Sequence, residues 1–173
     1  EKIVFEKISR VAECLRNLDY DIVLFDTATG LGPGVFEVCR EADFVLAPQR
    51  PEQLCLRSLP QVLRMIAAAR AENDAEGGEW PRLAGFVLAL ADPEDSSTLA
   101  DQREFRELLP SEMVFETVIP EHKDFREASR AAIPVALLRE RPSPSSLVFD
   151  QLAAEFEERI NLYEESSSNH TID

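Results

Sequence analysis

Lysine and histidine are scarce in this chain, and its charge is strongly unbalanced. The 173 residues contain two histidines and three lysines, Lys2, Lys7 and Lys123. There are 18 Lys plus Arg against 33 Asp plus Glu, which gives a formal net charge of −15. Because nucleic acid repels a chain of this charge, the composition excludes a protein that coats DNA or RNA through a broad basic surface.

Cysteine is also too sparse to define a covalent or metal-bound framework. Cys14, Cys39 and Cys55 are odd in number, no two of them form a CxxC pair, and no histidine lies near them. This spacing excludes both a disulfide scaffold and a zinc site. We expect the three thiols to be reduced residues of the core.

Long apolar runs are absent too. No run approaches the ~18 residues of a membrane span, and residues 1–5 lack the layout of a signal peptide. The sequence therefore predicts a cytoplasmic protein with no membrane partner. Because 45% of the residues are hydrophobic, we predict a single α/β domain over residues 1–163. The acidic, serine-rich residues 164–173 are predicted to be a disordered tail.

Short continuous apolar runs alternate with longer amphipathic segments along the chain. Strands are predicted at residues 22–25, 44–47, 83–90 and 113–119, with a further extended piece at 134–138. Helices are predicted at residues 5–18, 35–41, 54–70, 99–109, 124–131 and 147–162. This alternation is typical of a doubly wound, mostly parallel sheet with helices on both faces.

Ligands of such sheets bind beyond the carboxyl ends of the strands, where the loops 26–34, 48–53 and 120–124 are expected to lie. Asp26 ends an apolar run, as does the carboxylate that reaches the hydration shell of Mg²⁺ in P-loop NTPases. Alternatively, Asp26 caps the turn that follows it. His122 has no evident carboxylate or nucleophile beside it, so we expect a solvated side chain rather than an acid-base group.

The glycine-rich stretch at residues 30–34 does not match a phosphate-binding loop. A Walker A loop requires GxxxxGK[ST], and none of the three lysines follows a glycine. The alternating glycines at 30, 32 and 34 also differ from the dinucleotide pattern GxGxxG. The stretch is predicted to form a turn into the next helix.

Several segments, in collinear order, resemble the Walker B and C-terminal half of ParA/MinD-type ATPases, which are P-loop NTPases with a deviant Walker A loop. The first are Tyr20–Thr27 with Gly30, then Ala42–Pro48, and Pro51-Glu52 with Leu56–Leu59. The order continues with Gly85–Leu88 and Asp92-Pro93, Val118–Pro120 with Glu127-Ala128, and Pro134-Val135 with Leu152-Ala153 and Glu155. The resemblance covers residues 15–160.

This resemblance implies a chromosome or plasmid partitioning or positioning ATPase that dimerises around ATP and Mg²⁺. Asp26 corresponds to the Walker B acid in the shell of the Mg²⁺ ion, and Pro120, Glu121 and His122 would lie beside the nucleotide. Glu121 departs from the family, which usually has arginine at this position. The family's first strand, its lysine-bearing Walker A loop and its switch segment have no counterpart in the 173 residues.

The absence of a Walker A loop has consequences for both activity and fold. The P-loop backbone, its lysine and its Ser/Thr supply most of the catalysis of phosphoryl transfer. We therefore expect that this chain alone neither hydrolyses ATP nor binds it tightly. Because the family's P-loop strand lies in the middle of the sheet, its removal exposes an edge. Either the chain is part of a longer protein, or self-association or a protein partner covers that edge.

Arg57 and Arg64 are the candidate contacts for DNA or a protein partner, because they share a direction on one predicted helix. The alternative is a solvated helix face, and the net charge disfavours DNA. The C-terminal helix is acidic, so anionic membrane repels it. Two alternatives to a partial ATPase remain open: a non-catalytic interaction scaffold derived from a ParA-like ATPase, and an unrelated doubly wound domain.

Overall fold

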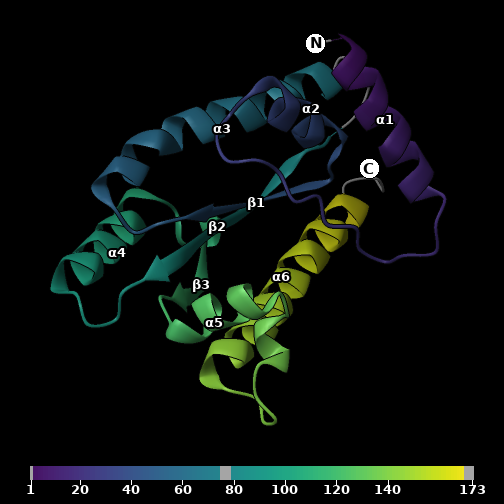
Figure 1. Ribbon diagram of the computed structural model, residues 1–173. Coiled ribbons are helices and arrows are strands. Elements are labelled where there is room, and N and C mark those ends of the chain that lie inside the picture. Colours follow the sequence, from purple (N-terminus) through teal and green to yellow (C-terminus); the bar gives the residue numbers. More distant parts are fainter. Residues whose placement is uncertain (1, 75–78, 170–173) are drawn as a thin grey trace. The chain divides into compact units, whose positions relative to one another are not determined.

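The computed structural model describes residues 2–74 and 79–169, in which helices and strands alternate (Figure 1). The chain forms two compact units. Unit 1 takes its residues from 1–45 and 58–83, and unit 2 from 46–57 and 84–173. The single domain over residues 1–163 that the sequence predicts stays a prediction.

The elements have the following bounds. The helices are α1 (Lys2–Arg16), α2 (Pro33–Glu41), α3 (Gln53–Asp74), α4 (Ser96–Leu108), α5 (Lys123–Ala131) and α6 (Pro144–Asn169). The strands are β1 (Phe44–Gln49), β2 (Arg82–Ala91) and β3 (Val114–Pro120), and two 3-10 turns are η1 (Ser111–Met113) and η2 (Val135–Leu137). All six helices that the sequence predicts are therefore present, although their first and last residues differ from the predicted ones.

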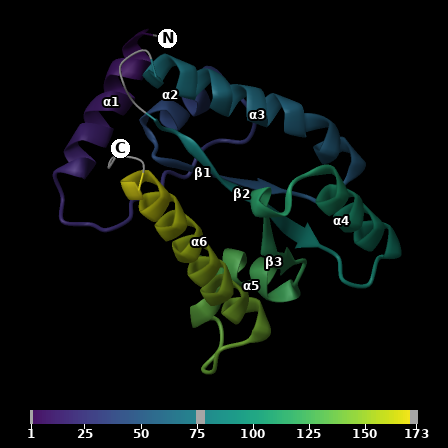
Figure 2. The same cartoon turned by 180° about the vertical axis from the view of Figure 1, so that it is seen from behind.

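The three strands form one sheet in the order β1-β2-β3 (Figure 2). β2 and β3 pair in parallel, with Phe86 opposite Val114 and Leu88 opposite Val118. Parallel neighbours require a crossover connection, and α4 lies between β2 and β3 in the chain. The predicted α/β fold with a parallel sheet is confirmed, as are the strands predicted at residues 44–47, 83–90 and 113–119.

Unit 2 has a core of aromatic and aliphatic side chains from β2, α4 and β3. Phe86, Phe105 and Phe115 are fully buried, and the rings of Phe86 and Phe105 meet edge to face with centroids 6.1 Å apart. Gly85 makes room for this packing, because a Cβ atom there would lie 2.7 Å from Phe115 Cε2. The continuous apolar run that predicts β2 thus follows from its central place in the core.

Helix α6 packs against β3 and binds its backbone through two side chains. The Glu155 carboxylate accepts hydrogen bonds from Glu116 N at 2.7 Å and Thr117 N at 2.9 Å. Arg159 donates to the carbonyls of Ala84, Glu112 and Val114. Since β3 is an edge strand of the sheet, the bonds to Val114, Glu116 and Thr117 satisfy backbone groups that a neighbouring strand would otherwise pair. The Ala84 and Glu112 carbonyls belong to β2 and η1.

Unit 1 combines α1 and α2 with most of α3. One face of α3 is buried, and its members recur at steps of three or four residues: Leu59, Val62, Ile66 and Ala69. Ser9 Oγ on α1 donates to Glu41 Oε1 on α2 at 2.6 Å, and Arg16 donates to the Glu41 carbonyl at 2.8 Å. Side-chain hydrogen bonds therefore join α1 to α2 in unit 1.

The strand predicted at Ile22–Phe25 is wrong: residues 22–28 have no regular secondary structure. Leu24 is 83% exposed, and Ile22, Val23 and Phe25 are exposed as well. A strand exists only through pairing with a neighbour, and within the described part of the chain no backbone hydrogen bond involves residues 20–31. The apolar composition therefore indicates strand propensity, but in the described residues no neighbouring strand pairs with this segment.

Two smaller predictions near the C-terminus also differ from the structure. Residues 135–137 form the 3-10 turn η2 rather than part of an extended piece. Helix α6 continues to Asn169, into the segment predicted to be disordered, while residues 170–173 lie outside the described residues. Among the helices of residues 2–74 and 79–169, none combines the length and apolarity of a membrane span.

Candidate functional site

Asp26 lies in unit 1, within the irregular segment between α1 and α2, and it is exposed. In the part of the chain that the structure describes, neither a hydrogen bond nor an ion pair holds its carboxylate. Within the described residues, the Asp26 carboxylate therefore accepts no hydrogen bond of the kind that a turn cap would accept. Its role in the shell of a Mg²⁺ ion stays a prediction.

The glycine-rich stretch leads directly into α2, as predicted. Gly32 is the N-cap residue, Pro33 begins the helix, and Gly30 has a φ of +97° that side-chain-bearing residues rarely adopt. A Cβ atom at Gly30, Gly32 or Gly34 would meet nothing within 4 Å. The stretch is therefore a turn with open space around its backbone.

Pro120, Glu121 and His122 lie together at the carboxyl end of β3, in unit 2. Glu121 N donates to the Ala91 carbonyl at 2.8 Å, so the ends of β2 and β3 are joined. His122 Nδ1 accepts the Asp124 N–H at 3.2 Å and caps α5. The loop lies where parallel sheets bind ligands, although contact with a nucleotide stays a prediction for all three residues.

Asp124 is the centre of a polar cluster that the sequence analysis missed. It is 3% exposed, and its carboxylate accepts from Arg139 Nη2 at 2.9 Å and from Ser145 Oγ at 2.8 Å. Arg139 Nη2 also lies 2.8 Å from Glu127 Oε2. The hydrogen bond from Arg139, followed by that from Ser145, lowers the pKa of Asp124. The cluster joins the first turn of α5 to the start of α6.

No spacing in the sequence reveals this cluster, because its members are 15 and 21 residues away from Asp124. Two weak signals exist. Asp124 stands in the first turn of α5, where an acid favours the helix, and the serines at 143, 145 and 146 surround the beginning of α6. Both are typical of helix starts in general, and neither indicates that a buried carboxylate connects two of them.

We predict that Asp124→Asn lowers the urea midpoint of the chain at pH 7, because asparagine is uncharged and forms no ion pair with Arg139, and it has only one acceptor oxygen for Arg139 and Ser145. Since the pKa of Asp124 is lowered in the folded chain, its stabilisation is present above the unfolded pKa of about 3.9. It is lost as the pH falls through the folded-state value. Urea midpoints of wild type and variant should therefore converge in acid. Asp150→Asn, at an exposed acid of α6, is the control, and a gap that persists at every pH contradicts the prediction.

The remaining carboxyl ends of the strands in unit 2 are rich in acidic side chains. Asp95 caps α4 by accepting from Ser97 N at 2.9 Å, and the hydrogen bonds from Ser97 lower its pKa. Gln53 donates to Asp101 at 3.0 Å and to Glu104 at 2.6 Å, while Arg50 pairs with Glu52 at 2.8 Å. Few cationic side chains are therefore available at this edge to bind a polyphosphate.

The described residues of unit 2 at this edge do not form a cradle for a triphosphate. A triphosphate requires backbone N–H groups and a lysine in a cradle, whereas the side chains here are mainly carboxylates. Within residues 2–74 and 79–169, no group of three His, Cys, Asp or Glu side chains could hold a metal ion. The described side chains at this edge therefore supply neither a lysine cradle for phosphates nor a metal cluster of three such ligands.

Arg57 and Arg64 are both exposed side chains of α3. Arg57 belongs to unit 2 and Arg64 to unit 1, and neither forms an ion pair with any residue that the structure describes. Arg64 lines a groove of unit 1 together with seven other residues. Their roles as DNA or partner contacts stay predictions.

The chain is similar in structure to the cell division ATPase MinD of Pyrococcus furiosus. The two match with a TM-score of 0.63 at 22% sequence identity, over 89% of this chain and 58% of the length of that ATPase. No protein-family model matches the sequence, and comparison with curated proteins yields no significant match. The structural likeness shows that this chain shares its α/β fold with that ATPase, of whose length it spans 58%.

Proposed function

We propose that this chain is the Walker B and C-terminal portion of a ParA/MinD-like partitioning or positioning ATPase. The observation that carries the proposal is the structural match to a MinD cell division ATPase over 89% of the chain. The collinear motifs support it independently, because they follow the order of the family from Asp26 to Glu155. In this proposal the full-length protein binds ATP and Mg²⁺ and dimerises around the nucleotide.

Asp26 is the proposed Walker B acid, and Pro120, Glu121 and His122 are the proposed neighbours of the nucleotide. The exposed position of Asp26 and the acidic carboxyl ends of unit 2 support a further point, that these 173 residues do not bind ATP tightly. Catalysis would depend on a phosphate-binding loop that the chain does not contain. We therefore propose no ATP hydrolysis by this chain alone.

The apolar residues Ile22–Phe25 are the proposed contact for the missing part of the sheet. Their side chains are exposed, and their backbone forms no hydrogen bond within residues 2–74 and 79–169. A β-strand from another segment or molecule would pair that backbone and bury apolar surface, at about 25 cal/mol per Å². Self-association or a protein partner is the proposed source of this cover.

The second candidate is a non-catalytic scaffold that keeps the fold and binds a protein partner. The acidic edge of unit 2 favours it, since the polar residues there bind one another rather than an anion. The two candidates differ in the coding sequence that precedes the codon of Glu1. A GKGGxGKT-like stretch there favours the ATPase, and its absence favours the scaffold.

Mg²⁺-dependent ATP turnover of the chain extended by those encoded residues tests the proposed function. We expect turnover that falls to background in the extended Asp26→Asn variant, because the Walker B acid would then be neutral. Asp21→Asn, at an exposed acid of the same segment, is the matched control and should retain turnover. An extended chain that folds but shows no turnover refutes the ATPase and leaves the scaffold.

A further inference from the structure

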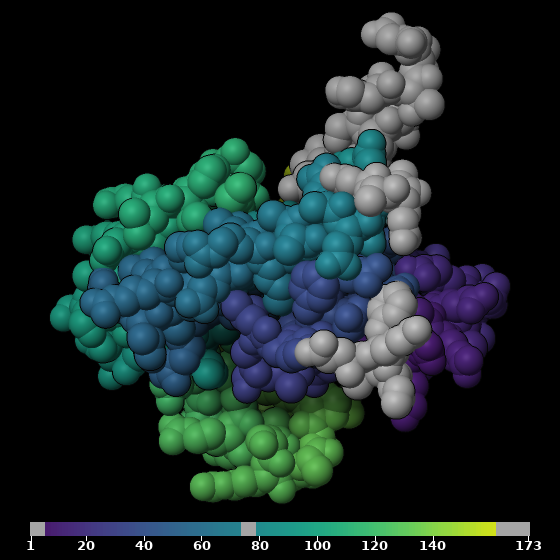
Figure 3. Space-filling view, turned by 90° about the horizontal axis from the view of Figure 1, so that it is seen from above, coloured from purple at the N-terminus to yellow at the C-terminus, as the bar shows by residue number. Residues whose placement is uncertain are grey.

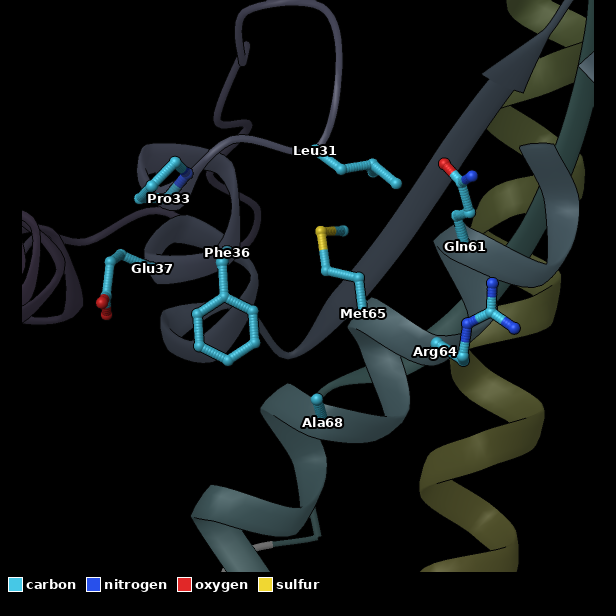
Figure 4. Close-up of a pocket in the computed structure, with 8 residues that line it drawn as sticks. All are labelled: Leu31, Pro33, Phe36, Glu37, Gln61, Arg64, Met65 and Ala68. Atoms are coloured by element: carbon cyan, nitrogen blue, oxygen red, sulfur yellow. The ribbon is translucent and has the colours of Figure 1, made fainter.

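Unit 1 has an open groove between the loop before α2, α2 itself and α3. Its volume is about 590 Å³, within the range of sites that bind ligands or short peptide segments. Apolar side chains form most of the walls, namely Leu31, Pro33, Phe36, Met65 and Ala68. Figure 4 shows Leu31 and Met65 pointing toward one another across the groove. In the space-filling view α3 runs along the surface with the residues of α2 beside it (Figure 3).

The two charged side chains of the groove differ in their partners. Glu37 Oε2 lies 3.5 Å from Arg40 Nη1, so its charge is matched within the protein. Arg64 is exposed and forms no ion pair with the residues described, and it lies with Gln61 at the end of the groove away from Glu37 (Figure 4). The groove therefore offers apolar walls and one guanidinium available for an acceptor.

The wall that contains Leu31 also has an unpaired backbone. Residues 28–31, which follow the segment proposed to pair with the rest of the sheet, form no backbone hydrogen bond within the described part of the chain, and the space around Gly30 and Gly32 is open. An extended peptide could pair with such a segment through its own N–H and C=O groups. A small apolar acid could not, so the groove suits a peptide better.

The net charge of the chain indicates which of the other possible ligands, nucleic acid, an anionic lipid surface or a peptide carboxylate, suits the groove. Nucleic acid needs several cations along its backbone, whereas the groove has one, on a chain with a net charge of −15. An anionic lipid surface is repelled for the same reason. A single carboxylate, in contrast, pairs with one guanidinium in a bidentate manner.

We propose that this groove binds a peptide segment of a partner protein in which an acidic residue precedes apolar residues. The acid pairs with Arg64, and the apolar side chains pack against Leu31, Phe36 and Met65. The inference goes beyond the proposed ATPase and does not require nucleotide. It assigns the carboxylate of the peptide's acidic residue as the ion-pair partner of Arg64.

The chain contains two methionines, and this allows a test with an internal control. Met65 lines the groove in unit 1, whereas Met113 lies in η1 of unit 2. The full chain is labelled with ¹³C at the methionine methyl groups and titrated with acetyl-Glu-Leu-Phe-Leu-amide to about 1 mM and above. We expect the Met65 signal to move while the Met113 signal stays in place.

Charge reversal then tests the role of Arg64. The peptide with lysine in place of glutamate should bind at least about tenfold more weakly. Arg64→Glu should invert this preference, while Arg57→Glu, on the same helix but not part of the groove wall, should leave it within about twofold. A Met65 signal that ignores the acidic peptide, that moves equally with both peptides, or that moves only with anionic lipid vesicles overturns the proposal. Since ATP is absent from every sample, failure here is distinguishable from failure of the proposed ATPase.

Discussion

Replacement of Arg159 by alanine is expected to lower the free energy of unfolding by about 3 kcal/mol. The side chain is 15% exposed and pairs with Glu155 Oε1 at 3.0 Å. It donates to the Ala84, Glu112 and Val114 carbonyls, and its guanidinium lies 4.1 Å from the centre of the Phe115 ring. Alanine would leave the carbonyls of Ala84 in β2, Glu112 in η1 and Val114 in β3 without this donor, and it would leave Glu155 without its cation.

Urea unfolding at pH 7, followed by circular dichroism, measures this loss. Arg126→Ala is the matched control, because Arg126 is an exposed arginine of unit 2 and an exposed charge contributes little. Glu155 also matters here: burial raises its pKa, but the hydrogen bonds from Thr117 and Glu116 outweigh burial and lower it overall. If Arg159→Ala and Arg126→Ala are equally stable, the hydrogen bonds from Arg159 of α6 do not stabilise the chain, and the prediction is wrong.

Gly85→Ala is expected to destabilise the chain by about 2 to 4 kcal/mol. Gly85 has a φ of +149°, which L-residues rarely adopt, and a Cβ atom there would lie 2.7 Å from Phe115 Cε2 and 3.1 Å from Arg159 Nη1. Phe115 is fully buried, so the ring cannot move aside without opening the core. Strain in the backbone and overpacking in the core therefore add.

Gly34→Ala provides the control for the loss of glycine itself. A Cβ atom at Gly34 would meet nothing within 4 Å, and Gly34 lies in the first turn of α2, where alanine is compatible with the backbone. We expect this variant to be as stable as wild type or slightly more stable. A Gly85→Ala variant with the urea midpoint of wild type would show that the close approach of Phe115 to β2 is not essential.

The sequence predicts the sheet where a strand buries both of its faces. β2 and β3 follow from continuous apolar runs, because such runs are typical of strands covered on both sides, and Phe86 and Phe115 are indeed fully buried. The equally apolar run Ile22–Phe25 is irregular and exposed, since a strand also needs a neighbour with which to pair its backbone. Composition reports the propensity of a segment, but not the presence of that neighbour.

In the candidate site too, the sequence predicts some residue positions and not others. The position of Pro120–His122 at the end of a strand follows from the alternation of elements, and the structure confirms that position. Asp124, Arg139 and Ser145 meet only because the connection between α5 and α6 folds back. Such a meeting of distant residues leaves no periodic signal in the sequence, so it could not be predicted.

The central proposal is that the chain, which shares its α/β fold with a MinD ATPase, does not itself form a site that binds ATP. Calorimetric titration of the 173-residue chain with ATP in the presence of Mg²⁺ measures this directly. We predict no saturable heat at nucleotide concentrations up to about 1 mM. Saturable one-to-one binding with a micromolar dissociation constant, abolished in Asp26→Ala, would contradict the proposal, because the nucleotide would then be bound by these residues without a Walker A loop.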